Sequence, residues 1–337
     1  MFISTLIIIS TALAADDILI LGNSYVFQQE VHKITAELFE LAGRTQSTSA
    51  LTGGGLTLPD HASRAATLGS EWNESLVQTE ENLHWVILQD QSQIPSLGRT
   101  SSYWQQSANA AVELNDLIEA KSGETMFFLT WGRRDGDSSN LEQNPDFPTM
   151  QENLTDGYLG YIGKTSDEDR PTWIAPVGIG FQYIYDDILA SGEDPLDQDS
   201  LFYRLYTNDG SHPSFLGAYL TACVFYGSIT GESTIGLAPP TQLSGEGDQE
   251  IATALQTAAD AAVFNHLERF DFIWEGTLNP DDTGEAVDPG DDTDDTDDTD
   301  MSSDDACGCF QSKTTLNSSW WLLTIIPAIT LRRRYSW

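Results

Sequence analysis

Two segments far apart in the chain carry residue types that together could hydrolyse an ester. Ile18–Ser24 has the pattern of a buried strand ending in Gly-Asn-Ser, and Asp209-Gly-Ser-His212 lies late in the chain. A serine hydroxyl is a weak nucleophile until a base removes its proton, and histidine suits that role near neutral pH. A carboxylate can fix the imidazole tautomer and stabilise its charged form. The combination predicts a triad of Ser24, His212 and Asp209.

Each segment also has a simpler interpretation when it is taken alone. Serine is a common N-cap, so Ser24 could merely cap a helix that starts near Gln28. The stretch from Asn208 to Ser211 is rich in turn formers and could be an exposed turn. The order of the two segments and their flanking patterns favour the hydrolytic interpretation.

Two further segments could supply hydrogen-bond donors to a developing oxyanion, which acyl transfer requires. Gly53–Gly55 follows a predicted strand and can offer backbone N–H groups with no side chain in the way. Gln89 and Gln91 follow the next predicted strand and can offer side-chain amides. The alternatives are a flexible turn for the glycines and ordinary loop polarity for the glutamines.

The elements that must position these residues alternate along the chain, which predicts an α/β fold with a parallel sheet and helices on both faces. Sites in such sheets form beyond the carboxyl ends of the strands. We expect strands at Ile18–Leu21, Ser47–Leu51, Trp85–Leu88, Met126–Thr130 and Thr172–Ala175, and helices at Gln28–Ala42, Tyr103–Ala120, Ala218–Ile229 and Glu250–Leu267.

With these motifs the chain resembles the SGNH (GDSL-like) hydrolases, serine esterases and lipases with a flavodoxin-like three-layer α/β/α sandwich and a mainly parallel sheet. Gly22–Ser24 matches the serine block, except that its usual Asp is Asn23, and Gly53–Leu58 matches the glycine block. Asp209–His212 matches the last block well. The third block departs most, since Gln89–Ser92 stands where the family has Gly-x-Asn-Asp. The resemblance covers nearly all of 17–267.

The resemblance implies that Ser24 is the nucleophile, that His212 is the base and that Asp209 orients it. It also implies an oxyanion hole made by the N–H groups of Ser24 and Gly55, with the Gln91 amide in place of an asparagine. Other residues near these blocks are candidates for substrate binding, namely Asn23, Gly54, His61, Gln89 and Trp131. His61 could instead be a surface residue at a helix start, and Trp131 could simply pack in the core.

Composition narrows the classes of function. The net charge is -37, with 52 acidic and 15 basic residues, so binding to nucleic acid through phosphates is not expected. The chain is 40% hydrophobic and 10% aromatic, which is enough to fill a core. His32, His84 and His266 do not fall at a recognisable metal-ligand spacing, so we expect no metal, and we expect no cofactor.

The two ends of the chain predict export. Residues 1–15 resemble a signal peptide, 16–275 form the hydrolase-like domain, and 276–306 form an acidic, disordered linker rather than a calcium-binding repeat. Residues 307–337 contain Cys307-Gly-Cys309, a short apolar segment and terminal arginines, an order that resembles the myxobacterial surface-sorting tail. This implies membrane attachment through the tail before processing, a sorting protease, and an extracytoplasmic location at the cell surface or outer membrane. A plain membrane anchor is the alternative.

The sequence therefore predicts an exported serine esterase that hydrolyses carboxylic esters with short acyl groups, on small alcohols or glycans, through an acyl-enzyme. A catalytically degenerate SGNH-fold protein that binds surface glycans is the rival, favoured by Gln91 in place of the family amide. A purely structural surface protein is a third hypothesis, which would make the triad a coincidence.

Overall fold

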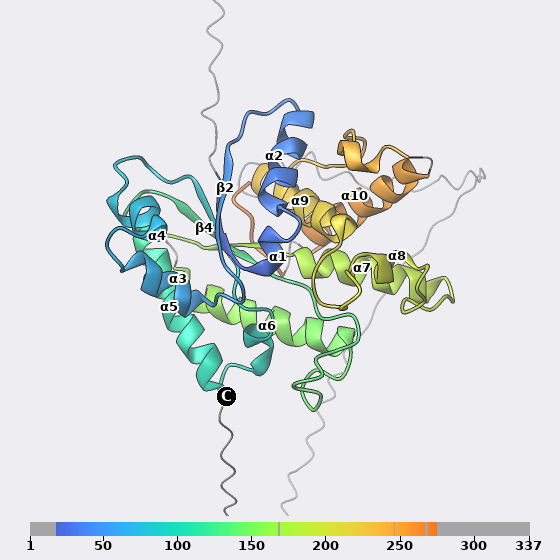
Figure 1. Ribbon diagram of the computed structural model, residues 1–337, viewed down its shortest axis with the longest axis horizontal. Helices are drawn as coiled ribbons and strands as arrows, with labels where there is room; N and C mark the ends of the chain where they lie inside the picture. Colours follow the sequence, from blue (N-terminus) through green and yellow to red (C-terminus); the bar gives the residue numbers. More distant parts are fainter. Residues whose placement is uncertain (1–17, 168, 246, 267–268, 275–337) are drawn as a thin grey trace, which may run out of the picture. The chain divides into compact units, whose positions relative to one another are not determined.

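Five strands form one parallel sheet in the order β2-β1-β3-β4-β5, as seen in the computed structural model (Figure 1). The structure describes residues 18–167, 169–245, 247–266 and 269–274. The strands are β1 (Ile18–Gly22), β2 (Thr48–Thr52), β3 (Trp85–Leu88), β4 (Glu124–Phe128) and β5 (Trp173–Ala175). This order is that of flavodoxin-like sheets. The predicted α/β fold with a mainly parallel sheet is confirmed.

Helices cover both faces of the sheet (Figure 1). On one side lie α3 (Leu58–Ala65), α4 (Glu71–Asn73), α5 (Ser102–Glu119) and α6 (Phe147–Thr165). On the other lie α2 (Val31–Leu41), α7 (Val177–Ala190), α9 (Phe215–Thr230) and α10 (Asp248–Phe264). Two single-turn helices, α1 (Ser24–Phe27) and α8 (Leu201–Arg204), lie in the connections. In the described ranges no helix combines the length and the apolar character that a membrane span needs.

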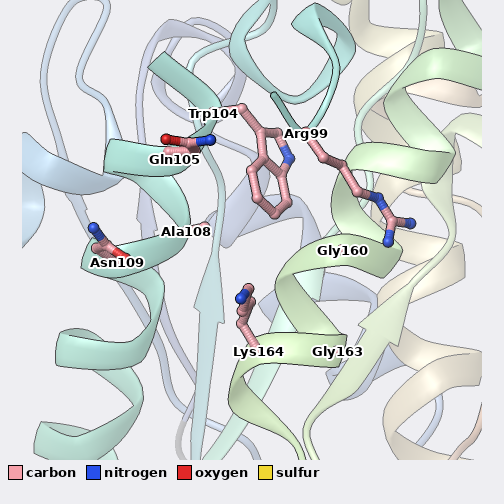
Figure 2. A pocket seen from close by; sticks show the side chains of 8 residues that line it. All are labelled: Arg99, Trp104, Gln105, Ala108, Asn109, Gly160, Gly163 and Lys164. Carbon is pink, nitrogen blue, oxygen red and sulfur yellow. The ribbon is translucent and has the colours of Figure 1, made fainter. Parts of the chain in front are cut away.

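The helix α6, which the sequence did not predict, contains glycines at which other segments pack closely. A Cβ on Gly157 would lie 2.0 Å from the Pro95 carbonyl oxygen, and one on Gly160 would lie 2.5 Å from the Trp104 ring. The 3-10 turn Ile94–Leu97 and α5 therefore approach α6 closely only because side chains are absent there. Where the two helices diverge they leave a cavity of about 470 Å³, lined by Trp104, Arg99 and Lys164 among others (Figure 2).

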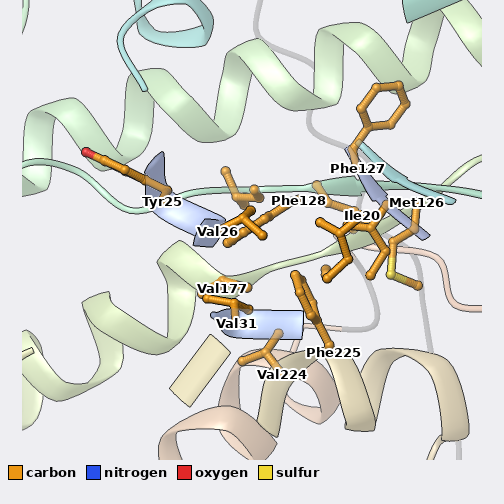
Figure 3. Close-up of a cluster of buried hydrophobic side chains, with 14 of the residues drawn as sticks. Ile20, Tyr25, Val26, Val31, Met126, Phe127, Phe128, Val177, Val224 and Phe225 are labelled. Carbon is orange, nitrogen blue, oxygen red and sulfur yellow. The ribbon is translucent and has the colours of Figure 1, made fainter. Parts of the chain in front are cut away.

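The core is centred on β1, whose five residues are all buried. Ile20 lies near Met126 and Phe128 of β4, with Val224 and Phe225 of α9 on the same side (Figure 3). Every residue from Gly217 to Ile229 in α9 is buried, so this helix is covered all round. The strand that ends at the candidate nucleophile is thus held on both faces and both edges.

The bounds of the predicted elements differ from those in the structure, and two of the differences have a clear cause. The helix expected at Gln28–Ala42 runs only from Val31 to Leu41, because Glu30 adopts the left-handed conformation with φ 50° and α2 begins after it. The strand expected at Met126–Thr130 runs from Glu124 to Phe128, because its register is set by pairing of Trp85 with Glu124. The predicted signal peptide, the linker and the tail with Cys307 and Cys309 lie outside the described residues and stay predictions.

Candidate active site

Ser24, His212 and Asp209 form a continuous hydrogen-bonded chain at the carboxyl edge of the sheet. His212 Nε2 lies 2.9 Å from Ser24 Oγ, and His212 Nδ1 lies 2.6 Å from Asp209 Oδ2. The His212 side chain is 25% exposed and that of Asp209 is 52% exposed, so the group is open to solvent. The structure brings together three residues that the sequence separates by up to 188 positions.

Ser24 is presented by a tight turn between β1 and α1. A Cβ on Gly22 would lie 2.5 Å from Val26 Cγ2 and 2.8 Å from Gln89 Oε1, so the turn requires glycine. Asn23 caps α1, since its side-chain oxygen accepts a hydrogen bond of 3.1 Å from Tyr25 N. The interpretation of Ser24 as a mere helix cap is therefore wrong, because Asn23 has that role and leaves the Ser24 hydroxyl to His212.

The Asp209–His212 turn is built around the carboxylate. Asp209 Oδ1 accepts hydrogen bonds from Ser211 N (2.8 Å), His212 N (2.9 Å) and the Thr207 hydroxyl (2.9 Å). Partial burial opposes ionisation, but these bonds and the one from the His212 ring outweigh it and hold the pKa of Asp209 well below its ordinary value. An ionised Asp209 fixes the proton on Nδ1 of His212 and leaves Nε2 free to accept the Ser24 proton.

Tyr25 and Trp131 hold the loop that carries His212. The Trp131 indole N–H donates to Ser211 O at 3.0 Å, and the Tyr25 hydroxyl lies 2.8 Å from Ser211 Oγ. The two rings stack at 4.7 Å with 2° between their planes, and the Tyr25 ring meets the His212 ring edge-on at 5.5 Å. Trp131 is fully buried, so it packs in the core, as one of its two interpretations held, and does not wall a substrate pocket.

The position of Tyr25 directly after Ser24 was the signal that sequence reasoning passed over. Burial raises the pKa of Tyr25, while Ser211, Ser92 and Arg133 act in the opposite direction through their contacts with its hydroxyl. One phenol therefore joins the nucleophile turn to the loops after β3 and β4 and to the His212 loop.

Three other predicted substrate-binding residues turn out to be buried supports. Gln89 accepts a hydrogen bond of 2.8 Å from Asn23 N and donates to Asp90 O. Asn23 donates to Leu56 O at 3.0 Å, which ties the glycine loop to the nucleophile turn. His61 is fully buried rather than a surface residue, and its Nδ1 accepts from the Trp72 indole at 2.8 Å. Side chains this deeply buried position the loops and do not line an open cleft.

Asp90, which sequence reasoning did not single out, is a further buried residue that supports the site. Its Oδ1 accepts from Leu58 N (3.0 Å) and Gln91 N (2.8 Å), and its Oδ2 accepts from the Tyr161 hydroxyl (2.8 Å). Burial raises its pKa, and these hydrogen bonds act in the opposite direction. The carboxylate thereby fixes the loop after β3 against the start of α3.

The expected oxyanion donors differ in whether their N–H groups already donate to another protein atom. Among the described residues, the backbone N–H groups of Ser24 and Gly55 donate to no protein acceptor. Gly54 and Gly55 are exposed, and Gly55 has φ 64°, which favours glycine. The Gln91 amide is engaged within its own loop, donating to Gln93 Oε1 at 3.1 Å and accepting from Gln93 N at 2.8 Å. One of its two side-chain N–H hydrogens remains for another acceptor.

The cavity between α5 and α6 and another of about 450 Å³ between α7 and α10 include no residue of the triad. Groups of three or more metal-ligating side chains do not occur in the described ranges. The triad therefore lies outside both of these cavities.

No protein-family model matches the chain, and no curated protein sequence matches it. Solved structures match in fold. A DUF4886 family protein from Bacteroides uniformis is 16% identical, with a TM-score of 0.55 over 74% of this chain and 96% of that one. A candidate SGNH hydrolase from Slackia heliotrinireducens is 20% identical, with a TM-score of 0.48 over 63% and 97%. The psychrotrophic esterase EstA from Pseudoalteromonas sp. is 17% identical, with a TM-score of 0.41 over 64% and 97%. At these identities the likeness concerns the fold.

Proposed function

We propose that this protein is a serine esterase that hydrolyses carboxylic esters through an acyl-enzyme. The observation that carries the proposal is the unbroken chain from Ser24 Oγ through His212 to Asp209, at 2.9 and 2.6 Å. Both distances are within hydrogen-bond reach, which general-base activation of a nucleophile requires.

The reaction follows from these contacts. His212 Nε2 takes the proton of Ser24 as Oγ bonds to the ester carbonyl carbon, and the carbonyl oxygen becomes an oxyanion. The free N–H groups of Ser24 and Gly55 stabilise that charge, with the remaining N–H of Gln91 as a third donor. His212 then gives its proton to the leaving alkoxide as the C–O bond breaks. Water, deprotonated by His212, attacks the acyl-enzyme and releases the acid and the serine hydroxyl.

The proposal extends to short acyl groups and to an exported setting. The open position of the triad supports small acyl groups, whose recognition needs no deep apolar cavity. The pattern of residues 1–15 and 276–337 supports export and display at the cell surface or outer membrane, with attachment through the tail and processing by a sorting protease. The excess of acidic residues argues against nucleic acid as a partner.

The test is hydrolysis of p-nitrophenyl acetate and butyrate by the full-length chain and by Ser24→Ala. We expect turnover by the parent and a fall in kcat of at least about 1000-fold in the variant. A folded parent no faster than Ser24→Ala, tested on these and on acetylated glycans, would contradict the proposal. The engaged amide of Gln91 favours a second candidate, a degenerate glycan-binding protein, for which glycan binding without turnover is the expected result.

A further inference from the structure

A cavity of about 400 Å³ opens beside the nucleophile helix, between the start of α2 and the start of α9. Its lining includes Gln28, Gln29, Glu30, Phe215 and Gln242. None of these residues belongs to the triad or to its buried supports, so the chemistry proposed above gives the cavity no role.

Two of the lining residues, Gln28 and Phe215, follow the catalytic residues closely in the two chain segments that form the site. Gln28 N donates to Ser24 O at 3.2 Å, and one turn of helix places their Cα atoms roughly 6 Å apart. Phe215 follows His212 by three residues, a span of at most about 10 Å. A substrate unit bound here would lie next to the unit whose ester bond reaches Ser24.

The lining carries unused amide groups flanked by aromatic faces. In the described part of the chain, the side chains of Gln28 and Gln29 make no hydrogen bond. Gln242 uses only its Oε1, which accepts from Thr241 Oγ1 at 3.2 Å. Phe215, the aromatic residue of the lining, is partly exposed, while Phe27 precedes Gln28 in the chain outside the lining and is 40% exposed. Amides that both donate and accept suit hydroxyl groups, and aromatic faces suit the C–H faces of a sugar ring.

The charged side chains at the cavity do not favour an anionic ligand. Lys33 forms an ion pair with Glu30, so each neutralises the other. Glu37 adds an acceptor rather than a cation, and its Oε1 already accepts from Thr241 N at 3.4 Å. A neutral, polyhydroxylated ligand fits this balance better than an anion.

The backbone at Glu30 is strained, which is common where a chain is shaped for a ligand. Glu30 has φ 50° and ψ 47° and makes no side-chain cap to α2. The left-handed conformation of Glu30 separates α1 from α2. Gln28–Glu30 therefore line the cavity instead of forming part of one continuous helix.

We propose that this cavity is a subsite for a neutral sugar unit next to the acylated one, which makes short-acyl esters of oligosaccharides the substrate class. This inference rests on the esterase function proposed above. The glutamine amides bind sugar hydroxyls, and Phe215 packs against the ring.

The test compares the full-length parent with the double variant Gln28→Ala/Gln242→Ala. The substrates are acetylated xylo-, manno- and cello-oligosaccharides beside p-nitrophenyl acetate. We expect kcat/KM on the preferred oligosaccharide to fall about tenfold more than on p-nitrophenyl acetate, mainly through KM. Gln106→Ala, an exposed glutamine on α5, is the matched control and should change neither value.

Two results would overturn the subsite while leaving the esterase intact. One is hydrolysis of p-nitrophenyl acetate but of none of the acetylated oligosaccharides. The other is an equal fall on both substrates in the double variant. Calorimetry of the unacetylated oligosaccharides with Ser24→Ala measures the subsite without turnover, and binding that the double change does not weaken would also overturn it. Failure of the esterase itself would appear instead as p-nitrophenyl acetate turnover that Ser24→Ala retains.

Discussion

Replacing Tyr25 with phenylalanine tests whether the Tyr25 hydroxyl positions the catalytic base. The ring keeps its stacking on Trp131 at 4.7 Å, so the substitution removes little besides the hydroxyl, its contacts with Ser92 and Arg133, and its 2.8 Å contact with Ser211 Oγ. Ser211 precedes His212 directly, so a change in this contact acts on the base without touching the reacting atoms.

The expected size follows from the lost hydrogen bond. A neutral bond contributes about 0.5–1.5 kcal/mol, and a buried polar group left without its partner costs about 1–3 kcal/mol. If most of this loss appears as displacement of His212, kcat falls about 5- to 50-fold, since each 1.36 kcal/mol is tenfold in rate. KM should change little because the Tyr25 side chain is buried away from substrate. The melting temperature should fall by about 2–8 °C.

The assay is kcat and KM on p-nitrophenyl acetate together with thermal unfolding, for Tyr25→Phe and for Tyr219→Phe. Tyr219 is also fully buried, and its hydroxyl accepts a 2.9 Å bond from Gln256 in a different part of the core. The control should lose stability but keep its kcat. If Tyr25→Phe loses stability as the control does and keeps kcat within twofold, the positioning role is refuted.

Three further outcomes follow. Asp209→Asn should lower kcat about 10³- to 10⁴-fold, measured on p-nitrophenyl acetate, because His212 loses its fixed tautomer. Gln91→Ala should lower kcat by less than tenfold, because Gln93 holds one of its two amide N–H hydrogens and the remaining one is the weakest of the three oxyanion donors; a 100-fold fall would show a full oxyanion donor. Burial lowers the pKa of His61 to about 4 from 6.5, so its contribution to stability is complete above pH 6.5 and is lost towards pH 4. Urea unfolding should show this loss, roughly 3 kcal/mol, in the parent but not in His61→Gln.

The ends of the candidate site could be predicted because local pattern decides them. Four apolar residues followed by Gly-Asn-Ser make a central strand that ends in a tight turn, and the structure has β1 at that place. Asp209 and His212 are close in sequence, so their mutual geometry is set by one turn that Gly210 permits with φ 67°. Such short-range features need no knowledge of distant partners.

The roles of Gln89 and His61 could not be predicted, because residues far away in the sequence determine which way these side chains face. A polar residue after a strand has the same pattern whether it faces solvent or another loop. Gln89 faces inward only because Asn23 N needs an acceptor there, and His61 only because Trp72 donates to it. The start of α2 after Glu30 could not be predicted either, because a glutamate in the sequence does not indicate a left-handed conformation.

The long separation of Ser24 from His212 in the sequence means that the two residues are synthesised at different times. The two residues are 188 positions apart, so at about 5–20 residues per second a ribosome makes His212 roughly 10–40 s after Ser24. Throughout that interval the serine is an ordinary hydroxyl, since nothing nearby can take its proton. Under the proposed esterase function, a nascent or prematurely terminated chain that lacks His212 would be unable to attack esters, and reactivity would arise only when His212 reaches Ser24 in the folded protein.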